Sequence, residues 1–356
     1  MAASFKLTHG DLGLRSLRSL CPTPPWALRT PRGGTQASPA ASALELNFYK
    51  IASGSRGGVY FPVASAIAKS ISNPPGSKSC EAGGNCGVPG LSATAQSTGG
   101  SVANVDALLQ DKYHAAIAQS DVTYWSYTAT GPFRTRKPNT KLCIIASLYS
   151  EEVHLVGARD ANINGMPDLA GKRVALGKPD SGSLLGSQLL VRAYGMTEGK
   201  DFTPSLVDFK GAQDLMKASK IEAFIYVSGY PNPAIKSMSE TLGSKLAAIN
   251  GPGRDRLTTA SPFYTNATIP ASTYANQPTP IETVAVPALW ISRTNVSDDL
   301  TYRITKAFWQ NSKTPSILAA GPAKASDITL PSAFKGASIP LCVGAQKFYK
   351  EIGMLQ

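Results

Sequence analysis

The chain has little of what catalysis or nucleic-acid binding requires. It holds three histidines in 356 residues, it has no G-x-S-x-G elbow, and the Gly182–Ser187 turn lacks the lysine of a phosphate-binding loop. The formal net charge is +12, yet the basic residues are scattered, and their densest cluster, Arg134–Lys137, has no interleaved aromatic residues. We therefore predict that the protein is not an enzyme and has no nucleic-acid partner.

Cysteine is sparse too, and its spacing argues against a metal site. None of the five cysteines belongs to a C-x-x-C pair, and no histidine is placed to complete a zinc set, so we predict no metal ion and no cofactor. Cys80 and Cys86 bracket the flexible segment E-A-G-G-N. In an oxidising compartment they would form a disulfide worth roughly 2 kcal/mol, whereas in the cytosol they would remain two loop thiols. We favour the disulfide.

Long apolar runs are absent as well. No segment approaches the ~20 apolar residues of a membrane-spanning helix, so we expect no span. Residues 1–44 contain several prolines and arginines, and although Ala37–Ala43 offers a small-residue cleavage site, the apolar centre of a secretory leader is missing. We expect this region to be unfolded, and we hypothesise that the true start differs or that a reading-frame error has replaced the leader.

From Glu45 onward the sequence alternates between strand-like and helix-like patterns, which predicts an α/β fold. The strand-like runs are Leu46–Ala52, Leu91–Gln96, Ala115–Ala118, Leu142–Leu148, Val153–Ala158, Ala223–Val227, Lys245–Ile249 and Thr283–Arg293. The helix-like segments are Val63–Ile71, a segment opening at Ser101, Val122–Tyr127, a segment ending near Tyr194, Ala212–Ala218 and Asp298–Asn311. We treat Leu142–Leu148 and Val153–Ala158 as two strands near a hinge.

Polar loops, most of them containing glycine, follow the predicted strands. The stretch Ser97–Asp121 shows the pattern most fully, because its loop S-T-G-G-S opens a helix and a second strand then ends in Q-S-D. In an open α/β sheet such loops gather outside the carboxyl ends of the strands, where ligands bind. Free N–H groups and the helix dipole there favour an anion. An ordinary βα turn is the alternative interpretation. Similar loops are Ser53–Tyr60, Pro179–Ser183 and Ser228–Asn232.

These loops fall into two groups along the chain, which predicts two lobes. We assign residues 45–152 and 261–356 to lobe 1 and residues 153–260 to lobe 2, with paired hinge strands between them. The facing loops would form a cleft lined by hydroxyls, amides and backbone N–H groups. Closure of the lobes would bury a small polar anion without any cofactor.

Several motifs in fixed order resemble the TAXI group of solute receptors. They include G-S-R-G-G-V-Y-F-P-V (54–63), Q-S-T-G-G-S-V-A-N (96–104), A-Q-S-D (118–121), D-L-A-G-K-R-V-A-L-G (168–177), S-G-Y-P-N-P-A-I (228–235) and I-P-L-C-V-G-A-Q-K-F-Y-K-E (339–351). The resemblance extends from about residue 46 to the end of the chain. It implies a two-lobe, periplasmic-binding-protein-like (type II) fold.

The resemblance also implies a function. TAXI proteins are receptors of tripartite ATP-independent periplasmic (TRAP) transporters, so we expect a secreted, periplasmic monomer that delivers glutamate, glutamine or a related C5 dicarboxylate to a membrane permease driven by an ion gradient. A ligand-presenting module for a membrane sensor kinase is the alternative. The sequence departs from the family pattern at Arg56, where a small residue is usual and the cleft mouth becomes more basic, and at Cys342, which stands where a histidine is usual.

The matching motifs carry the expected ligand contacts. They are Gly57, Gly58 and Tyr60 in one wall, Ser97, Gly100, Ser101 and Asn104 from lobe 1 with Gln119 and Asp121 nearby, and Ser181, Gly182, Ser183, Ser228 and Asn232 from lobe 2. Each of them taken alone could equally be a turn or a helix cap.

Overall fold

The computed structural model describes residues 45–356. Its strands are β1 (Asn47–Ala52), β2 (Ser72–Asn73), β3 (Val88–Pro89), β4 (Leu91–Gln96), β5 (Ala115–Gln119), β6 (Leu142–Gly157), β7 (Arg173–Ala175), β8 (Thr203–Ser205), β9 (Ala223–Ser228), β10 (Lys245–Ala247), β11 (Thr265–Ile269) and β12 (Ile281–Arg293). Its α-helices are α1 (Tyr60–Ile71), α2 (Ser101–Leu109), α3 (Ser120–Thr128), α4 (Gly182–Ala193), α5 (Phe209–Lys217), α6 (Pro233–Thr241), α7 (Gly251–Ala260), α8 (Asp298–Gln310), α9 (Thr314–Ala319) and α10 (Val343–Glu351). Short 3₁₀ turns are η1 (Gly131–Phe133), η2 (Met166–Leu169), η3 (Ala323–Asp327) and η4 (Leu330–Ser332). The prediction that residues 1–44 are an unfolded or replaced leader lies outside the described residues.

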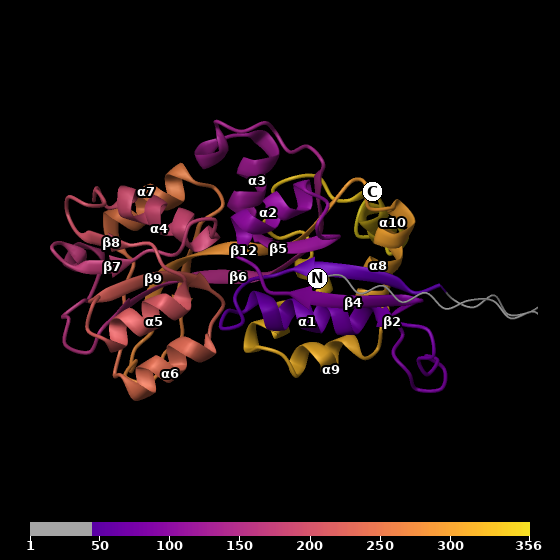
Figure 1. Cartoon of the computed structure of the whole chain (residues 1–356), viewed down its shortest axis with the longest axis horizontal. Helices are drawn as coiled ribbons and strands as arrows, with labels where there is room; N and C mark the ends of the chain where they lie inside the picture. Colours follow the sequence, from indigo (N-terminus) through magenta and orange to yellow (C-terminus); the bar gives the residue numbers. More distant parts are fainter. Residues whose placement is uncertain (1–44) are drawn as a thin grey trace, which may run out of the picture. The chain divides into compact units, whose positions relative to one another are not determined.

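The strands form one mixed sheet with two long strands in its middle. The order is β3-β2-β4-β1-β5-β12-β6-β9-β7-β8, with β10 paired to β6 and β11 paired to β12. The strand β1 runs parallel to β4 and β5, and β7 runs parallel to β8 and β9, whereas β12 and β6 are antiparallel to each other. Figure 1 shows β6 and β12 running through the middle of this part of the chain, with α4 to α7 around one end.

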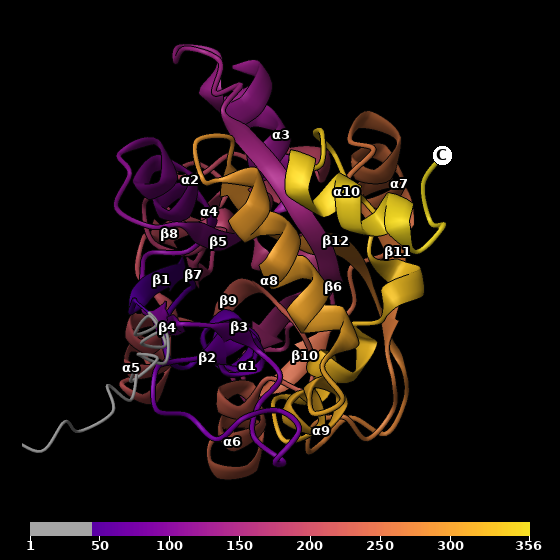
Figure 2. The same cartoon turned by 90° about the vertical axis from the view of Figure 1, so that its right-hand side faces the viewer.

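Helices cover both faces of the sheet on the side of β4, β1 and β5. On one face, α1, α8 and α10 pack around Trp290 and Ile145, and Figure 2 shows α8 and α10 side by side in front of the long strands. On the other face, α2 contributes Val102 and Val105 and α3 contributes Val122 to a second apolar cluster. We call these two clusters together the first core.

The sheet around β9, β7 and β8 is covered in the same way. The helices α4 and α7 pack on one face and α5 and α6 on the other, and these two clusters form the second core. Both clusters also contain residues beyond 260, among them Tyr264, Ile269 and Val286. The predicted lobe boundaries remain a prediction, and this packing favours a return to lobe 1 within β12 rather than at residue 261.

The prediction of two separate strands at Leu142–Leu148 and Val153–Ala158 is wrong. The structure has one strand, β6, that pairs with β12 from Leu142 through Glu152 and with β9 from Glu152 through Gly157. The polar residues Glu151 and Glu152 interrupt the apolar pattern, yet both are buried inside the strand. Each carboxyl group finds a partner far away in the sequence, Tyr60 for Glu151 and Lys324 for Glu152.

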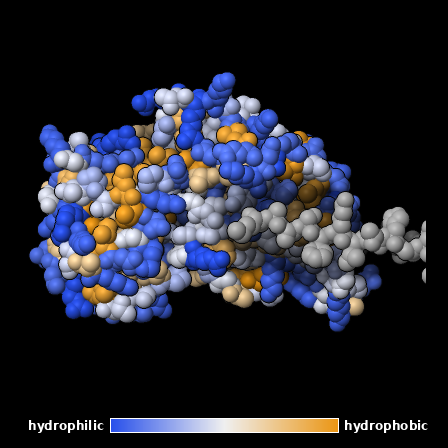
Figure 3. All heavy atoms as spheres, viewed as in Figure 1, coloured by the Kyte–Doolittle hydropathy of each residue, from blue (hydrophilic) through white to orange (hydrophobic). Residues whose placement is uncertain are grey.

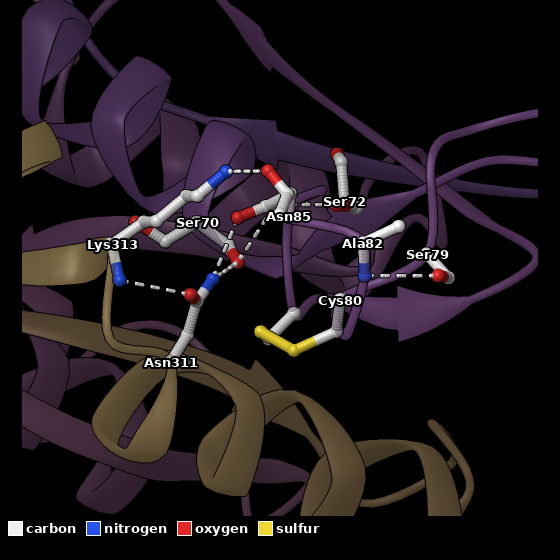
Figure 4. Close-up of a disulfide and its surroundings, with 10 residues drawn as sticks. Ser70, Ser72, Ser79, Cys80, Ala82, Asn85, Asn311 and Lys313 are labelled. Atoms are coloured by element: carbon white, nitrogen blue, oxygen red, sulfur yellow. Dashed lines mark hydrogen bonds between the residues drawn. A yellow bond between two sulfur atoms is a disulfide. The ribbon is translucent and has the colours of Figure 1, made fainter.

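Two disulfides hold segments of the first core. Cys80 bonds to Cys86, as the sequence favours, and Cys143 at the start of β6 bonds to Cys342, which the sequence analysis did not pair. Figure 4 shows how the Cys80–Cys86 loop docks: the side-chain amide of Asn311 donates to Asn85 Oδ1 at 2.7 Å. The loop is thereby fixed against the end of α8.

Candidate functional site

A cavity of about 230 Å³ lies between the two cores. The loops that follow β1, β4, β5, β7, β8 and β9 supply most of its wall, as expected for the carboxyl ends of strands. The lining residues are Gly54, Ser55, Arg56, Gly58, Val59, Tyr60, Ser97, Thr98, Gly99, Gly100, Ser101, Gln119, Glu151, Gly177, Lys178, Ser181, Gly182, Ser183, Asp208, Phe209, Tyr226, Val227 and Ser228.

Four helices begin at this cavity, namely α1 at Tyr60, α2 at Ser101, α4 at Gly182 and α5 at Phe209. The capping residues of α1 and α2 offer no side-chain hydrogen bond. Within residues 45–356, the N–H groups of Ser101 and Gly182 have no hydrogen-bond partner. Free N–H donors and the positive ends of the helix dipoles therefore point to an anionic group in the cavity.

Glycine is required at two positions where these helices meet. Gly100 has a φ of 105°, a backbone conformation that other residues rarely adopt. A Cβ on Gly182 would lie 2.0 Å from Gln119 Oε1 and 2.8 Å from Ser101 Oγ. The absence of a side chain at Gly182 thus lets the start of α4 approach the end of β5.

Gln119 presents an unused amide oxygen at this point. The residue is 2% exposed, and its Oε1 is buried without a hydrogen-bond partner in the described part of the chain. A buried amide oxygen without a partner costs about 1–3 kcal/mol. A bound ligand that donates a hydrogen bond to Gln119 would remove that cost, so this amide oxygen is available to accept a hydrogen bond from a ligand.

Glu151 places a carboxyl group in the cavity wall. It is 3% exposed, and its Oε2 accepts a hydrogen bond from the Tyr60 hydroxyl at 2.6 Å. The same hydroxyl lies 3.3 Å from Ser101 Oγ, so these groups form a continuous polar chain. Burial raises the pKa of Glu151 well above its usual 4.5, which favours the neutral acid.

Two cationic side chains also line the cavity. The Arg56 guanidinium lies over the Phe61 ring, 4.9 Å from its centroid. Lys178 reaches across toward the other core, since a Cβ on Gly99 would lie 3.3 Å from its Nζ. Neither cation has an ion-pair partner among residues 45–356. Asp208 lines the cavity as well, but its carboxylate caps α5 through the Gly211 N–H at 2.8 Å.

The cavity brings together ten of the residues expected from the sequence: Gly58, Tyr60, Ser97, Gly100, Ser101, Gln119, Ser181, Gly182, Ser183 and Ser228. Four others, Gly57, Asn104, Asp121 and Asn232, do not line it. The amide of Asn104 donates to the Ser53 and Ile117 carbonyls, and Asn232 caps α6. The Gly57 carbonyl accepts from Asn232 at 3.5 Å. These residues support the wall from behind.

Asp121 is fully buried away from the cavity lining. Its carboxylate accepts hydrogen bonds from the Val122 N–H at 2.7 Å and from the Tyr264 hydroxyl at 2.9 Å. Burial raises its pKa from 3.8 to about 6, and the two hydrogen bonds limit the increase. Asp121 therefore joins α3 to the segment before β11 instead of facing a ligand.

Sequence reasoning missed Glu151, Lys178 and Tyr226 as lining residues. A signal for Glu151 was present, because side chains alternate in a strand and one member of the Glu151-Glu152 pair had to face the loops around Tyr60. Nothing local in the sequence distinguishes Lys178 or Tyr226 from other exposed polar residues of an α/β protein.

A second, wider groove of about 820 Å³ lies beside α3, α4 and α7, and none of the predicted site residues lines it. Figure 3 shows apolar surface (orange) over α4 and between α4 and α3, on a face that is otherwise largely hydrophilic.

Within residues 45–356, no group of three or more His, Cys, Asp and Glu side chains is arranged to hold a metal ion. The helices described there are also too short or too polar to cross a membrane.

Comparison with known proteins gives one family and a set of structural likenesses. The chain is similar to an ancestral arginine-binding protein bound to arginine, at 14% identity over 77% of this chain and 97% of that one, with a TM-score of 0.45. It is also similar to the alkanesulfonate-binding protein SsuA from Xanthomonas axonopodis pv. citri bound to MOPS, at 14% identity over 88% of this chain and 95% of that one, with a TM-score of 0.42. The sheet and its covering helices confirm the predicted α/β fold class, and the two-lobe, periplasmic-binding-protein-like (type II) architecture stays a prediction. A model of the NMT1-like family matches residues 51–353, and the protein belongs to that family.

Proposed function

We propose that the protein is an extracytoplasmic solute receptor that binds a small anionic metabolite in the cavity between its two cores. One observation carries the proposal: four helices begin at a single cavity, and the first N–H groups of α2 and α4 have no hydrogen-bond partner there within residues 45–356. Arg56 and Lys178 add positive charge without ion-pair partners in the described residues. A carboxylate would satisfy both kinds of group.

The cavity is small and polar, which suits a metabolite rather than a lipid or a peptide. About 230 Å³ is less than the range typical of drug-sized ligands. Its wall is made mainly of serines, glycines and backbone groups that come from both cores. Contact between the cores already exists, because the Ala103 N–H donates to the Asp180 carbonyl at 3.0 Å. A ligand that bridges the same elements would stabilise this closed arrangement.

Delivery to a TRAP permease is the finer part of the proposal and rests on the resemblance to TAXI receptors. Glutamate, glutamine and related C5 dicarboxylates are the solutes that this resemblance implies. Two disulfides support an oxidising, periplasmic compartment. The alternative is that the same closed form engages a membrane sensor kinase. A gene for a large multi-span permease beside this one would favour transport, and a sensor-kinase gene would favour signalling.

A thermal-shift screen tests the receptor. The full chain is unfolded and refolded to remove carried ligand, and amino acids, dicarboxylates and oxo acids are then added singly. A ligand at about 100 times its dissociation constant stabilises the folded protein by ~2.7 kcal/mol, which raises the melting temperature by a few degrees. A shift with an anionic solute is the expected result.

Matched charge variants locate the binding. We expect Lys178→Gln and Arg56→Gln to reduce the shift, because each removes a cation from the cavity wall. Lys200→Gln removes an exposed cation outside the cavity and should leave the shift unchanged. Equal losses in all three variants, or no shift with any anion, would contradict an anion site in this cavity. Turnover of a bound solute would instead indicate an enzyme.

A further inference from the structure

The solute cavity contains an unexpected acid. Its lining includes two cationic side chains, Arg56 and Lys178, and two carboxyl side chains, Glu151 and Asp208. Asp208 is occupied in capping α5. Glu151 has one oxygen free, since only Oε2 has a hydrogen-bond partner within residues 45–356. When it is ionised, a carboxyl group beside the anion-binding N–H groups repels a second carboxylate of a solute and attracts a cationic group.

The position of Glu151 relative to the helix ends carries the argument. Glu151 Oε2 is 2.6 Å from the Tyr60 hydroxyl, and that hydroxyl is 3.3 Å from Ser101 Oγ. Ser101 is also the first residue of α2, with a free N–H group. The Tyr60 hydroxyl thus links an acceptor carboxyl to the residue that opens α2 through two short contacts. The α-carbon of an amino acid bears an ammonium and a carboxylate side by side, and these two groups suit the carboxyl and the N–H group respectively.

We propose that Glu151 is the specificity-determining residue of this cavity, and that it selects a solute with an ammonium group beside its carboxylate over the matching acid without nitrogen. This inference rests on the proposed receptor function and narrows the solute class. The solute carboxylate meets the N–H groups of α2 and α4, and its ammonium donates to the free oxygen of Glu151. Arg56 and Lys178 remain available for an anionic side chain.

Pairing with the ammonium changes the protonation of Glu151. The titratable and charged groups that interact with Glu151 are Tyr60 from α1, Tyr149 and Glu152 from β6, Tyr226 from β9, Asp121 from α3, Tyr264 before β11 and Lys324 from η3. Burial and the neighbouring carboxyls raise the pKa of Glu151, and Tyr60 and Lys324 oppose that rise. A cation placed against the carboxyl favours its ionised form, so the proton leaves to the solvent when the amino acid binds.

Matched ligand pairs test the selection. The probes are L-glutamate with glutarate, L-glutamine with glutaramate, L-aspartate with succinate, and L-alanine with propionate, so the two members of each pair differ only in the ammonium group. For the full-length wild type we expect at least one amino acid to bind at least about 10-fold more tightly than its partner. In Glu151→Gln, which keeps the shape and the Tyr60 contact, we expect the amino acid to lose about 10- to 100-fold in affinity, the value of a hydrogen bond to a charged group.

Asp214→Asn is the control, because it neutralises an exposed carboxylate that does not line the cavity. It should retain the preference for the amino acid. A second measurement needs no variant: calorimetry of the wild type in two buffers of different ionisation enthalpy should show up to about one proton released per amino acid bound, and none for the matching acid.

Each outcome decides between the proposals. Equal binding of both members of the pairs, retention of the preference in Glu151→Gln, or its loss in Asp214→Asn would overturn the role of Glu151. The anion receptor would survive each of these results. A wild type that binds none of the eight probes and no other anion overturns the receptor as well.

Discussion

Replacing the buried carboxyl group of Asp121 by an amide should stabilise the protein at neutral pH. Asp121 is 0% exposed, and each of its oxygens accepts one hydrogen bond, from the Val122 N–H at 2.7 Å and from the Tyr264 hydroxyl at 2.9 Å. In Asp121→Asn, the amide oxygen can still accept from Val122, and the amide nitrogen can donate to the Tyr264 oxygen. The change therefore removes a charge while it keeps the shape and both contacts.

The magnitude follows from the shifted pKa. Burial raises the pKa of Asp121 in the folded protein from 3.8 to about 6, so the folded state favours the protonated form. The stability that this preference contributes is present below pH 3.8 and is lost as the pH rises through about 6. A shift of about two units corresponds to about 3 kcal/mol. We compare the free energy of unfolding of Asp121→Asn with that of the wild type. The variant's advantage over the wild type should increase by this amount between acid and neutral pH.

Urea unfolding of both proteins between roughly pH 4 and pH 8 measures this difference. Asp214→Asn provides the control, because Asp214 carries the same charge at an exposed position, paired only with Lys210. It should change little across the same range. A difference between Asp121→Asn and the wild type that stays constant with pH would refute the reasoning.

Three further substitutions test other parts of the structure. Replacing Cys143 and Cys342 together by serine should lower the free energy of unfolding by about 5 kcal/mol in urea titration, because the disulfide closes a loop with a sequence separation of 199; a loss below about 1 kcal/mol would contradict the bond. Lys324→Met should cost about 3–5 kcal/mol at neutral pH, since it leaves Glu152 buried without its partner at 2.9 Å. Burial already raises the pKa of Glu152 to about 7 despite Lys324, so the cost should shrink on acidification, and a cost independent of pH would count against this account. Gly182→Ala should weaken solute binding by at least about 10-fold with little change in the melting temperature of the ligand-free protein, because the new Cβ displaces a flexible side chain in the cavity; unchanged affinity would show that the start of α4 is not part of the site.

Local patterns in the sequence were sufficient to predict many of the strands and helices. The apolar runs at Leu91–Gln96 and Ala115–Ala118 correspond to β4 and β5, and the loop between Ser97 and Ser101 opens α2 as expected. These elements follow from short-range periodicity and from glycine, which a single sequence displays directly. The helix α7 is not among the predicted helices, since it begins with Gly251-Pro252-Gly253, residues typical of a turn, although proline is common in the first turn of a helix.

Long-range pairings were the part that the sequence could not supply. Glu151 is stabilised inside a strand by Tyr60, which lies 91 residues earlier, and Glu152 by Lys324, which lies 172 residues later. The two predicted strands leave out this acidic pair, and no local pattern shows that distant groups stabilise it inside one continuous strand. The same limit applied to the Cys143–Cys342 bond and to the position of Lys178 beside Gly99, because each depends on how distant loops meet.

The two long strands also determine how the protein unfolds. Each of them contributes side chains to both cores: β6 supplies Ile145 to the first and Leu155 to the second, and β12 supplies Trp290 and Val286 in the same way. If either core unfolded, these strands would lose the packing contacts that they make in it, and part of the sheet would lose its strand partners. The cores are therefore coupled, and we expect residues 45–356 to melt in one cooperative transition, which a calorimetric enthalpy equal to the van't Hoff enthalpy would demonstrate.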